Sequence, residues 1–326
     1  MPQSSIASAV GRVRAAARKP LGEAQLERLL SAASYDEALR LLGEMGWPDL
    51  QGLSVEQLSV QMIEQACSRL REITPDLMLT DTFLLRHDAQ NLKSLFKARI
   101  LGVKADGLSN CGTISLDTLH HAVTEHIYRN LPPAFESVMK TLEQNISISV
   151  NPMEIDVRID QALYGMIEQK LKSCKSHPSK DYFAGKADLQ NAIAYLRLNA
   201  MQTSSIKLED ILLPGGTIKK KSWMEIAAKP EKLVSSFRNY GKTIQLRLMK
   251  AQQDGREVPA LEKAADDYLL DLFRPMRNDP FSIEVLIGWL LAHEREASAV
   301  RLIMAGKLND FPQELIRERL RDAYGR

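Results

Sequence analysis

The stretch DTFLLRHDAQNLKSLFKARILG, residues 81–102, predicts one long amphipathic helix, because its apolar residues recur at intervals of three and four. One hundred residues further along, part of the same pattern returns in register. The recurring identities are Asp81, Phe83, Asp88, Gln90 and Asn91, which correspond to Asp181, Phe183, Asp188, Gln190 and Asn191. A pattern repeated over this distance predicts two structurally equivalent helices within a repeat protein.

The rest of the chain supports an all-α fold. Of its 326 residues 44% are hydrophobic and 26% charged, which is typical of a globular protein. Apolar residues follow helical spacing almost everywhere, and the best strand candidate, NISISV at residues 145–150, is short and isolated. Three widely separated cysteines without a Cys-x-x-Cys motif predict free thiols in a reducing compartment.

Three copies of one helical pattern follow each other along the chain. A lead helix carries Met-Ile-Glu-Gln at residues 62–65 and again at 166–169, and residues 261–273 form a third candidate. An Asp-x-Phe sequence then predicts the start of each long helix, at residues 81–83, 181–183 and 279–281. A glycine turn and a short helix are predicted to end each copy, with the turns at residues 112–114, 216–218 and 306–308.

The sequences near the two ends of the chain predict how the three copies are arranged relative to each other. Residues 21–34, LGEAQLERLLSAAS, resemble a turn and short helix, so the chain would begin late in one copy. We therefore expect three similar helical units, called repeats below, in a pseudo-threefold, funnel-shaped arrangement, with the N-terminal segment docked beside the C-terminal repeat. The expected domains are residues 1–124 (N-terminal helix and first repeat), 125–228 (second repeat) and 229–326 (third repeat).

Signatures of catalysis or cofactor binding are weak. Gly241-Lys242-Thr243 lacks the second glycine of a phosphate-binding loop and is expected within a continuous helix over residues 235–250. His120, His121 and His126 do not form a zinc motif, and the pair Asp266-Asp267 is interpreted as surface charge. The expectation is a protein without catalytic residues, cofactor or metal.

The distribution of charge bears on the kind of partner. A net charge of +2 argues against nucleic acid as the main partner. Positive residues still gather near the N-terminus, at Arg12, Arg14, Arg18 and Lys19. Such a cluster is usually a solvated face, and the alternative is contact with phosphate or lipid headgroups. The most apolar stretch, residues 281–292, contains Glu284 and is too short to span a bilayer.

Several motifs, taken in order, resemble the C subunit of the A/V-type ATPases, whose counterpart in the vacuolar enzymes is the d subunit. They are GRVRAAARKPL near the N-terminus, DAQNLKSLFKARILG from residue 88, ILLPGGTI from residue 211 and EREASAVRLIMAGKLNDFPQELIRERL from residue 294. Ala299 stands where the family often has Asn. The resemblance covers the whole length and implies an all-helical funnel of three units without an active site.

The resemblance also implies a role and partners. A protein of this kind would be a rotor socket between the central shaft subunits and the proteolipid ring, during ion-driven ATP synthesis or ATP-driven ion pumping. It would lie at the cytoplasmic face of the membrane as a peripheral protein, touching the membrane only through the ring or lipid headgroups. The alternative is a cytoplasmic helical-repeat scaffold that binds another protein.

Two sets of polar residues have different expected roles. Because each repeat must solve the same packing problem, the recurring polar residues favour a structural role. They are Asp81, Asp88, Asn91, Asp181, Asp188 and Asn191. Basic residues that do not recur as a set are better candidates for contact with a partner, and these are Lys93, Lys97, Arg99, Lys219, Lys220 and Lys221.

Overall fold

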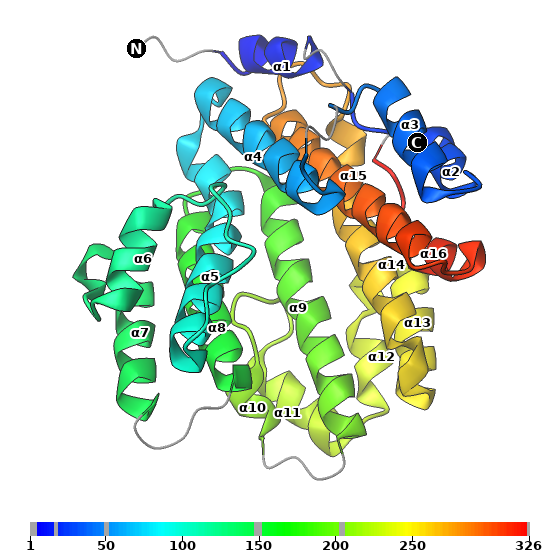
Figure 1. Ribbon diagram of the computed structural model, residues 1–326. Helices are drawn as coiled ribbons and strands as arrows, with labels where there is room; N and C mark the ends of the chain where they lie inside the picture. The colour runs from blue at the N-terminus through cyan, green and yellow to red at the C-terminus, as the bar shows by residue number, and fades with distance from the viewer. Residues whose placement is uncertain (1–4, 16–18, 49–51, 147–151, 202–205, 325–326) are drawn as a thin grey trace. The chain divides into compact units, whose positions relative to one another are not determined.

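The computed structural model describes residues 5–15, 19–48, 52–146, 152–201 and 206–324, and the chain there forms helices and connecting turns (Figure 1). The described residues contain no strand, which confirms the predicted all-α class. Two compact bodies divide the chain. Body 1 combines residues 1–75 with residues 256–326, and body 2 comprises residues 76–255.

Body 1 is built from both ends of the chain. Its helices are α1 (Ile6–Arg14), α2 (Glu23–Leu30), α3 (Tyr35–Glu44), α4 (Val55–Ile73), α14 (Val258–Asp271), the short η4 (Arg274–Met276), α15 (Glu284–Leu308) and α16 (Gln313–Arg319). Leucines of α2 and α3 share one buried core with Val300, Ile303 and Met304 of α15. The N-terminal segment therefore docks beside the C-terminal repeat, as the sequence predicts.

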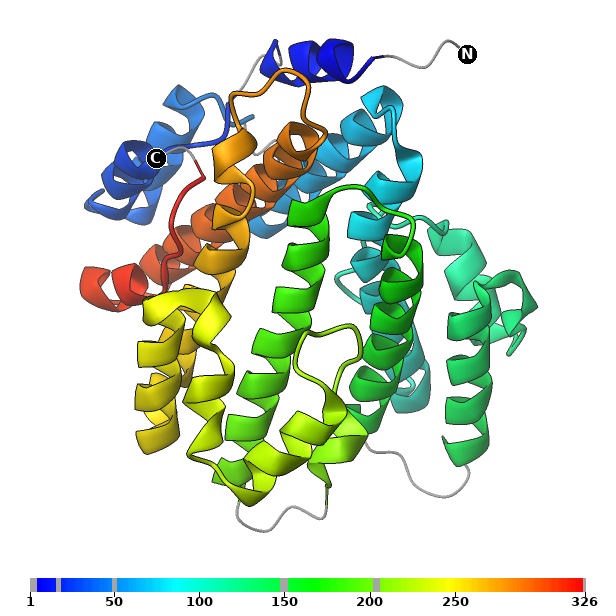
Figure 2. The same cartoon turned by 180° about the vertical axis from the view of Figure 1, so that it is seen from behind.

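Body 2 holds the central part of the chain, which both views of the ribbon show in cyan to yellow (Figures 1 and 2). Its helices are α5 (Leu77–Leu101), α6 (Leu116–Thr124), η1 (Tyr128–Asn130), α7 (Pro133–Ile146), α8 (Pro152–Leu171), α9 (His177–Ala200), α10 (Leu208–Ile211), α11 (Lys220–Ala228), α12 (Lys232–Ser236), η2 (Arg238–Tyr240) and α13 (Gly241–Gln253); η3 (Gly255–Glu257) follows at the boundary with body 1. Rings of Phe83, Tyr182 and Phe183 pack together in this body, with centroids 4.6–5.2 Å apart.

Each body contains one extensive pairing between a lead helix and a long helix. In body 1 the lead helix α4 packs along α15, and in body 2 the lead helix α8 packs along α5. In both cases the lead helix and the long helix that it covers come from different predicted repeats.

Some predicted helix boundaries are wrong. Asp81 and Asp181 do not begin the long helices, because α5 starts after Asp76 and α9 after Ser176. The residues that cap the two helices are Asp76, whose Oδ1 lies 2.9 Å from the amide of Leu79, and Ser176, whose Oγ lies 3.1 Å from that of Ser179. Asp279 also lies outside the helix, since α15 begins at Glu284.

Two predicted features near glycines differ as well. The third glycine turn, at Gly306, is a helical position inside α15, where the side chain of Ile316 leaves no room for a Cβ. The expected continuous helix over residues 235–250 is interrupted, because Gly241 adopts a φ of 84° and separates η2 from α13. Within the strand candidate NISISV, residues 147–150 lie outside the described residues, and so do residues 16–18 of the opening helix.

Candidate functional site

The repeated polar pair on α5 fastens a loop to the helix. Asp88 is fully buried and accepts hydrogen bonds from the amide (2.9 Å) and hydroxyl (2.7 Å) of Thr113 and from the amide of Ile114 (3.0 Å). One turn further on, Asn91 exchanges two hydrogen bonds with the backbone of Ser109, at 2.8 and 2.9 Å. Together the two side chains satisfy backbone groups of the loop between α5 and α6.

The same device occurs on α9. Asp188 is fully buried and accepts from the amide (2.8 Å) and hydroxyl (2.5 Å) of Thr217 and from the amide of Ile218 (3.2 Å). Asn191 exchanges two hydrogen bonds with the backbone of Leu213, at 2.8 and 3.0 Å. Here the hydroxyl of Tyr240 adds a further donor to Asp188, at 2.6 Å. We call each buried carboxylate and the backbone amides that it holds a carboxylate latch.

A third carboxylate latch lies in body 1 and joins the two ends of the chain. Glu296 on α15 is only 2% exposed, and its Oε1 accepts from the amide of Leu21 (3.2 Å) and from the indole Nε1 of Trp47 (3.0 Å). Leu21 lies two residues before the start of α2. It belongs to residues 21–34, which resemble the turn and short helix predicted at the end of each repeat. Sequence reasoning missed Glu296 because Glu replaces Asp and Ala299 replaces the recurring Asn.

Glycines permit the close approach of the first two latches. A Cβ added to Gly112 would lie 2.2 Å from the Asp88 Oδ1, and one added to Gly216 would lie 2.2 Å from the Asp188 Oδ1. Burial raises the pKa of Asp88, and the hydrogen bonds from Ile114 and Thr113 partly oppose this rise. These carboxylates accept hydrogen bonds from backbone amides of the adjoining loops, a geometry that fits a role in packing.

The recurring Asp81 and Asp181 do not share an environment. Asp81 is half-buried within α5, whereas Asp181 is exposed on α9. The recurrence of an aspartate at these positions therefore does not mark a second common latch.

Two of the predicted partner-contact residues tie helices together within body 2. Lys93 pairs with Asp160 and Lys97 with Asp156, each with 2.5 Å between the side-chain nitrogen and a carboxylate oxygen. Both aspartates lie on α8, so the two lysines connect α5 to α8. The side chain of Lys93 is only 13% exposed, which leaves it little surface for a partner protein.

Arg99 is the centre of a polar cluster between α5 and α7. Its guanidinium donates to both carboxylate oxygens of Glu143, at 2.9 and 2.7 Å, and to the carbonyl of Val123 at 2.7 Å. The hydroxyl of Tyr128 donates to the same carboxylate at 2.5 Å, and His126 lies 2.9 Å from it. Burial alone would raise the pKa of Glu143, but the hydrogen bonds from Tyr128 and Arg99 outweigh it and lower the pKa.

The remaining predicted contacts, Lys219, Lys220 and Lys221, are exposed at the start of α11. The amine of Lys220 lies 3.6 Å from a carboxylate oxygen of Glu209. Because both side chains are exposed, this pair contributes little to stability and can exchange for another anion. These three lysines are therefore better placed for contact with a partner than the three basic residues of α5.

A group of exposed apolar side chains near the ends of the long helices was not predicted from the sequence. Leu101 and Val103, at the end of α5, are 72% and 59% exposed, and Met201, after α9, is 57% exposed. At the end of α15, Leu308 and Phe311 are 65% and 52% exposed. The available signal was an apolar residue at or just beyond each helix end, where polar residues are more usual.

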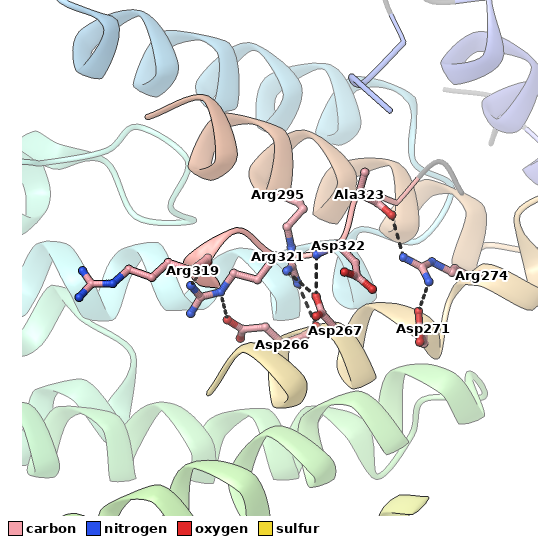
Figure 3. Close-up of polar contacts among 9 residues, drawn as sticks. All are labelled: Asp266, Asp267, Asp271, Arg274, Arg295, Arg319, Arg321, Asp322 and Ala323. Carbon is pink, nitrogen blue, oxygen red and sulfur yellow. Dashed lines mark hydrogen bonds and ion pairs between the residues drawn. The ribbon is translucent and has the colours of Figure 1, made fainter. Parts of the chain in front are cut away.

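Asp266 and Asp267 of α14 hold the C-terminal tail, and the interpretation of Asp267 as surface charge is wrong (Figure 3). Asp267 Oδ1 accepts from Arg295 and from the amide of Asp322, both at 3.0 Å. Arg321 donates to Asp266 at 2.9 Å. Burial raises the pKa of Asp267, an effect that Arg295 opposes. The sequence could not show this, because the tail lies about 55 residues further along.

The candidate enzyme motifs gain no support from the geometry. Gly241-Lys242-Thr243 begins α13 directly after η2, without a preceding strand in the described residues. None of the histidines near residue 120 gathers with two further metal-ligating groups in the described part of the chain. Among the helices described, none is both long and apolar enough to cross a bilayer.

Comparison with known proteins identifies the family. The model of the ATP synthase (C/AC39) subunit family matches residues 9–319, so the chain belongs to that family. It is 26% identical over 263 residues to the C subunit of the V-type sodium ATPase of Enterococcus hirae, covering 78% of each chain.

Archaeal relatives extend over nearly the whole chain. The C subunit of the A-type ATP synthase of Methanocaldococcus jannaschii is 21% identical, over 95% of this chain and 84% of its own length. That of Thermococcus onnurineus is 24% identical, over 96% of this chain and 89% of its own. The resemblance predicted from the motifs is thus confirmed at the level of the family.

Proposed function

We propose that this chain is a non-catalytic rotor component of an A/V-type ATPase, a socket that couples the central shaft to the membrane proteolipid ring. Membership of the ATP synthase (C/AC39) subunit family carries the proposal, because the family model covers residues 9–319. The relatives are named as the C subunit of an A-type ATP synthase or of a V-type sodium ATPase. The coupling would serve ion-driven ATP synthesis or ATP-driven ion pumping, at the cytoplasmic face of the membrane.

The internal construction suits a part that must transmit torque. The carboxylate latches of Asp88, Asp188 and Glu296 fix a loop or chain end to each long helix through buried hydrogen bonds. A close-packed helical body has low compressibility and passes on an applied strain. We propose that the latches mark three equivalent repeats, arranged about a pseudo-threefold axis.

Contacts with partner subunits would use exposed side chains that take no part in the carboxylate latches. The apolar residues near the ends of α5, α9 and α15 offer area for a protein partner, since large exposed apolar side chains often mark interaction sites. Lys219, Lys220 and Lys221 would add contacts to acidic groups of the ring or to lipid headgroups. Lys93, Lys97 and Arg99 would act mainly by holding together body 2, which presents the ends of α5 and α9.

Affinity purification of the tagged chain from its native membranes tests the proposal. We expect the shaft and proteolipid subunits to be recovered with it. Replacing Leu308 and Phe311 with Glu should reduce that recovery, whereas Leu246→Glu, on the 47% exposed Leu246 of α13, is the matched control. Absence of both ATPase partners from the purified material would contradict the proposed function. Equal recovery with all three variants would contradict the role of the α15 end.

A further inference from the structure

Part of the N-terminal basic cluster faces a hollow in body 1. The hollow has a volume of about 680 Å³ and is lined by residues of α1, the segment before α2, α15 and the C-terminal tail. Its basic members are Arg14, Lys19 and Arg277. The guanidinium of Arg14 donates to the backbone carbonyl of Arg277 at 3.1 Å, which brings these two residues to the same edge.

The walls of the same hollow are mostly apolar and partly aromatic. Val285, Trp289 and Ala292 present one side of α15 to it, and Val13 of α1 and Tyr324 of the tail complete the apolar lining. No acidic side chain occurs among its described lining residues. Three basic side chains thus line a partly aromatic hollow that has no acidic residue in its described lining, and such a lining attracts an anion.

The tail wall is fixed in place. The hydroxyl of Tyr324 donates to the carbonyl of Phe273 at 3.3 Å. Gly288 of α15 makes room for the same ring, because a Cβ there would lie 2.3 Å from the Tyr324 hydroxyl. The tail that carries Tyr324 is also held by Arg274, which donates to the carbonyl of Ala323 at 2.7 Å (Figure 3). The hollow is therefore bounded by packed elements.

We propose that this hollow binds a phosphate ester with an apolar body, the phosphate on Arg14, Lys19 and Arg277 and the apolar body against Trp289 and Tyr324. Guanidinium groups match phosphate oxygens in charge and in paired hydrogen-bond geometry. An indole and a phenol supply a flat apolar surface for the remainder of the ligand. The volume lies within the usual range of about 300–1,000 Å³ for small-molecule sites. This binding activity is independent of the coupling role proposed above.

Two sources could supply this chemistry, an anionic phospholipid of the membrane or a soluble nucleotide. The fluorescence of the full-length chain reports on both, because Trp289 is half-exposed at the hollow whereas Trp47 and Trp223 are buried. Titration with adenosine monophosphate tests the soluble source. Titration with phosphatidylcholine vesicles, with and without phosphatidic acid, tests the membrane source. We expect a saturable change in one of the two titrations, and its absence from the Trp289→Phe variant.

Matched charge-reversal variants distinguish specific binding at the hollow from non-specific electrostatic attraction to the N-terminal helix. Arg14→Glu should lower the affinity for the ligand that gives the saturable change by at least about tenfold, because it places a carboxylate in the phosphate position. Arg12→Glu makes the same charge change on the same helix, but Arg12 does not line the hollow. It should leave the affinity within about twofold, as expected for exposed, screened charge. Circular dichroism checks that both variants fold.

Two results would overturn the proposal. One is the absence of any saturable change with either adenosine monophosphate or phosphatidic acid vesicles. The other is an equal loss of affinity in Arg12→Glu and Arg14→Glu, which would assign the binding to the overall charge of the N-terminal helix. Lys19→Glu supplies a second variant at the hollow, outside helix α1, and is expected to behave like Arg14→Glu.

Discussion

Replacing Gly112 with Ala should break the first carboxylate latch. Gly112 does not have a positive φ, so its backbone conformation itself tolerates alanine. The added Cβ would lie 2.2 Å from the Asp88 Oδ1 and 3.0 Å from its Cγ, so either the loop or the buried carboxylate must move. Overpacking of this kind costs about 1–3 kcal/mol.

Movement of Asp88 would also weaken its hydrogen bonds to the loop. Losing one bond to a buried charged group costs about 1.5–3 kcal/mol, so the total loss should be about 2.5–6 kcal/mol. That is a large part of the usual 5–15 kcal/mol stability of a folded protein. With a slope of about 3 kcal/mol per M, the urea midpoint of body 2 should fall by roughly 0.8–2 M.

Urea unfolding followed by far-UV circular dichroism measures this loss. The control is Gly165→Ala, within α8, where an added Cβ meets no atom within 4 Å. It should raise the midpoint slightly, because Ala is favoured over Gly in a helix by about 0.5–1 kcal/mol. The two substitutions thus add the same methyl group and should change stability in opposite directions.

A double-mutant cycle identifies the cause. In an Asp88→Ala background the carboxylate that would clash with the added Cβ of Gly112→Ala is absent. The second substitution should therefore cause almost no further loss of stability. The reasoning is refuted if Gly112→Ala is as stable as the original chain, or if its cost is unchanged when Asp88 is already Ala.

Two further predictions concern buried polar groups. Because its folded-state pKa is lowered, Glu143 contributes stability above its ordinary pKa of 4.5, and this contribution is lost as pH falls through the folded-state pKa. Glu143→Gln should therefore lower the thermal midpoint at neutral pH, with a deficit that shrinks at acidic pH; a pH-independent deficit would contradict this. Trp47→Phe should cost about 1.5–3 kcal/mol more than Trp223→Phe in urea unfolding. Both indoles are buried, but Trp47 donates to Glu296, whereas the Trp223 Nε1 has no partner among the described residues; equal costs would contradict this prediction.

The sequence predicted the latches only where identical residues recur. Asp88 and Asp188 stand one hundred positions apart, and each precedes an Asn by three residues, so the pattern is visible in the chain. At Glu296 the side chain is longer and the Asn is absent, so the third latch is recognised only when Leu21 is found beside this carboxylate. Longer reach is useful there, because the same carboxylate also accepts from Trp47.

Helix starts and ion pairs were harder to predict for a different reason. The caps of α5 and α9 are Asp76 and Ser176, which are different residue types that both accept a hydrogen bond from a backbone amide of the first turn. Asp81 and Asp181 are identical residues at corresponding positions, so the repeated pattern points to them in place of the true caps. The role of Asp267 depends on a tail 55 residues away, and a sequence does not show which distant charges meet.

The joining of the chain ends has a consequence for folding. The core of body 1 combines leucines of α2 and α3 with Val300, Ile303 and Met304 of α15, and all of body 2 lies between these two segments in the sequence. During synthesis the apolar faces of α2 and α3 must therefore wait for α15, whereas body 2 is complete earlier. Closing so long a loop delays the contacts of body 1, so we infer that it folds last. The benefit is that residues near each end of the chain bury apolar side chains near the other end.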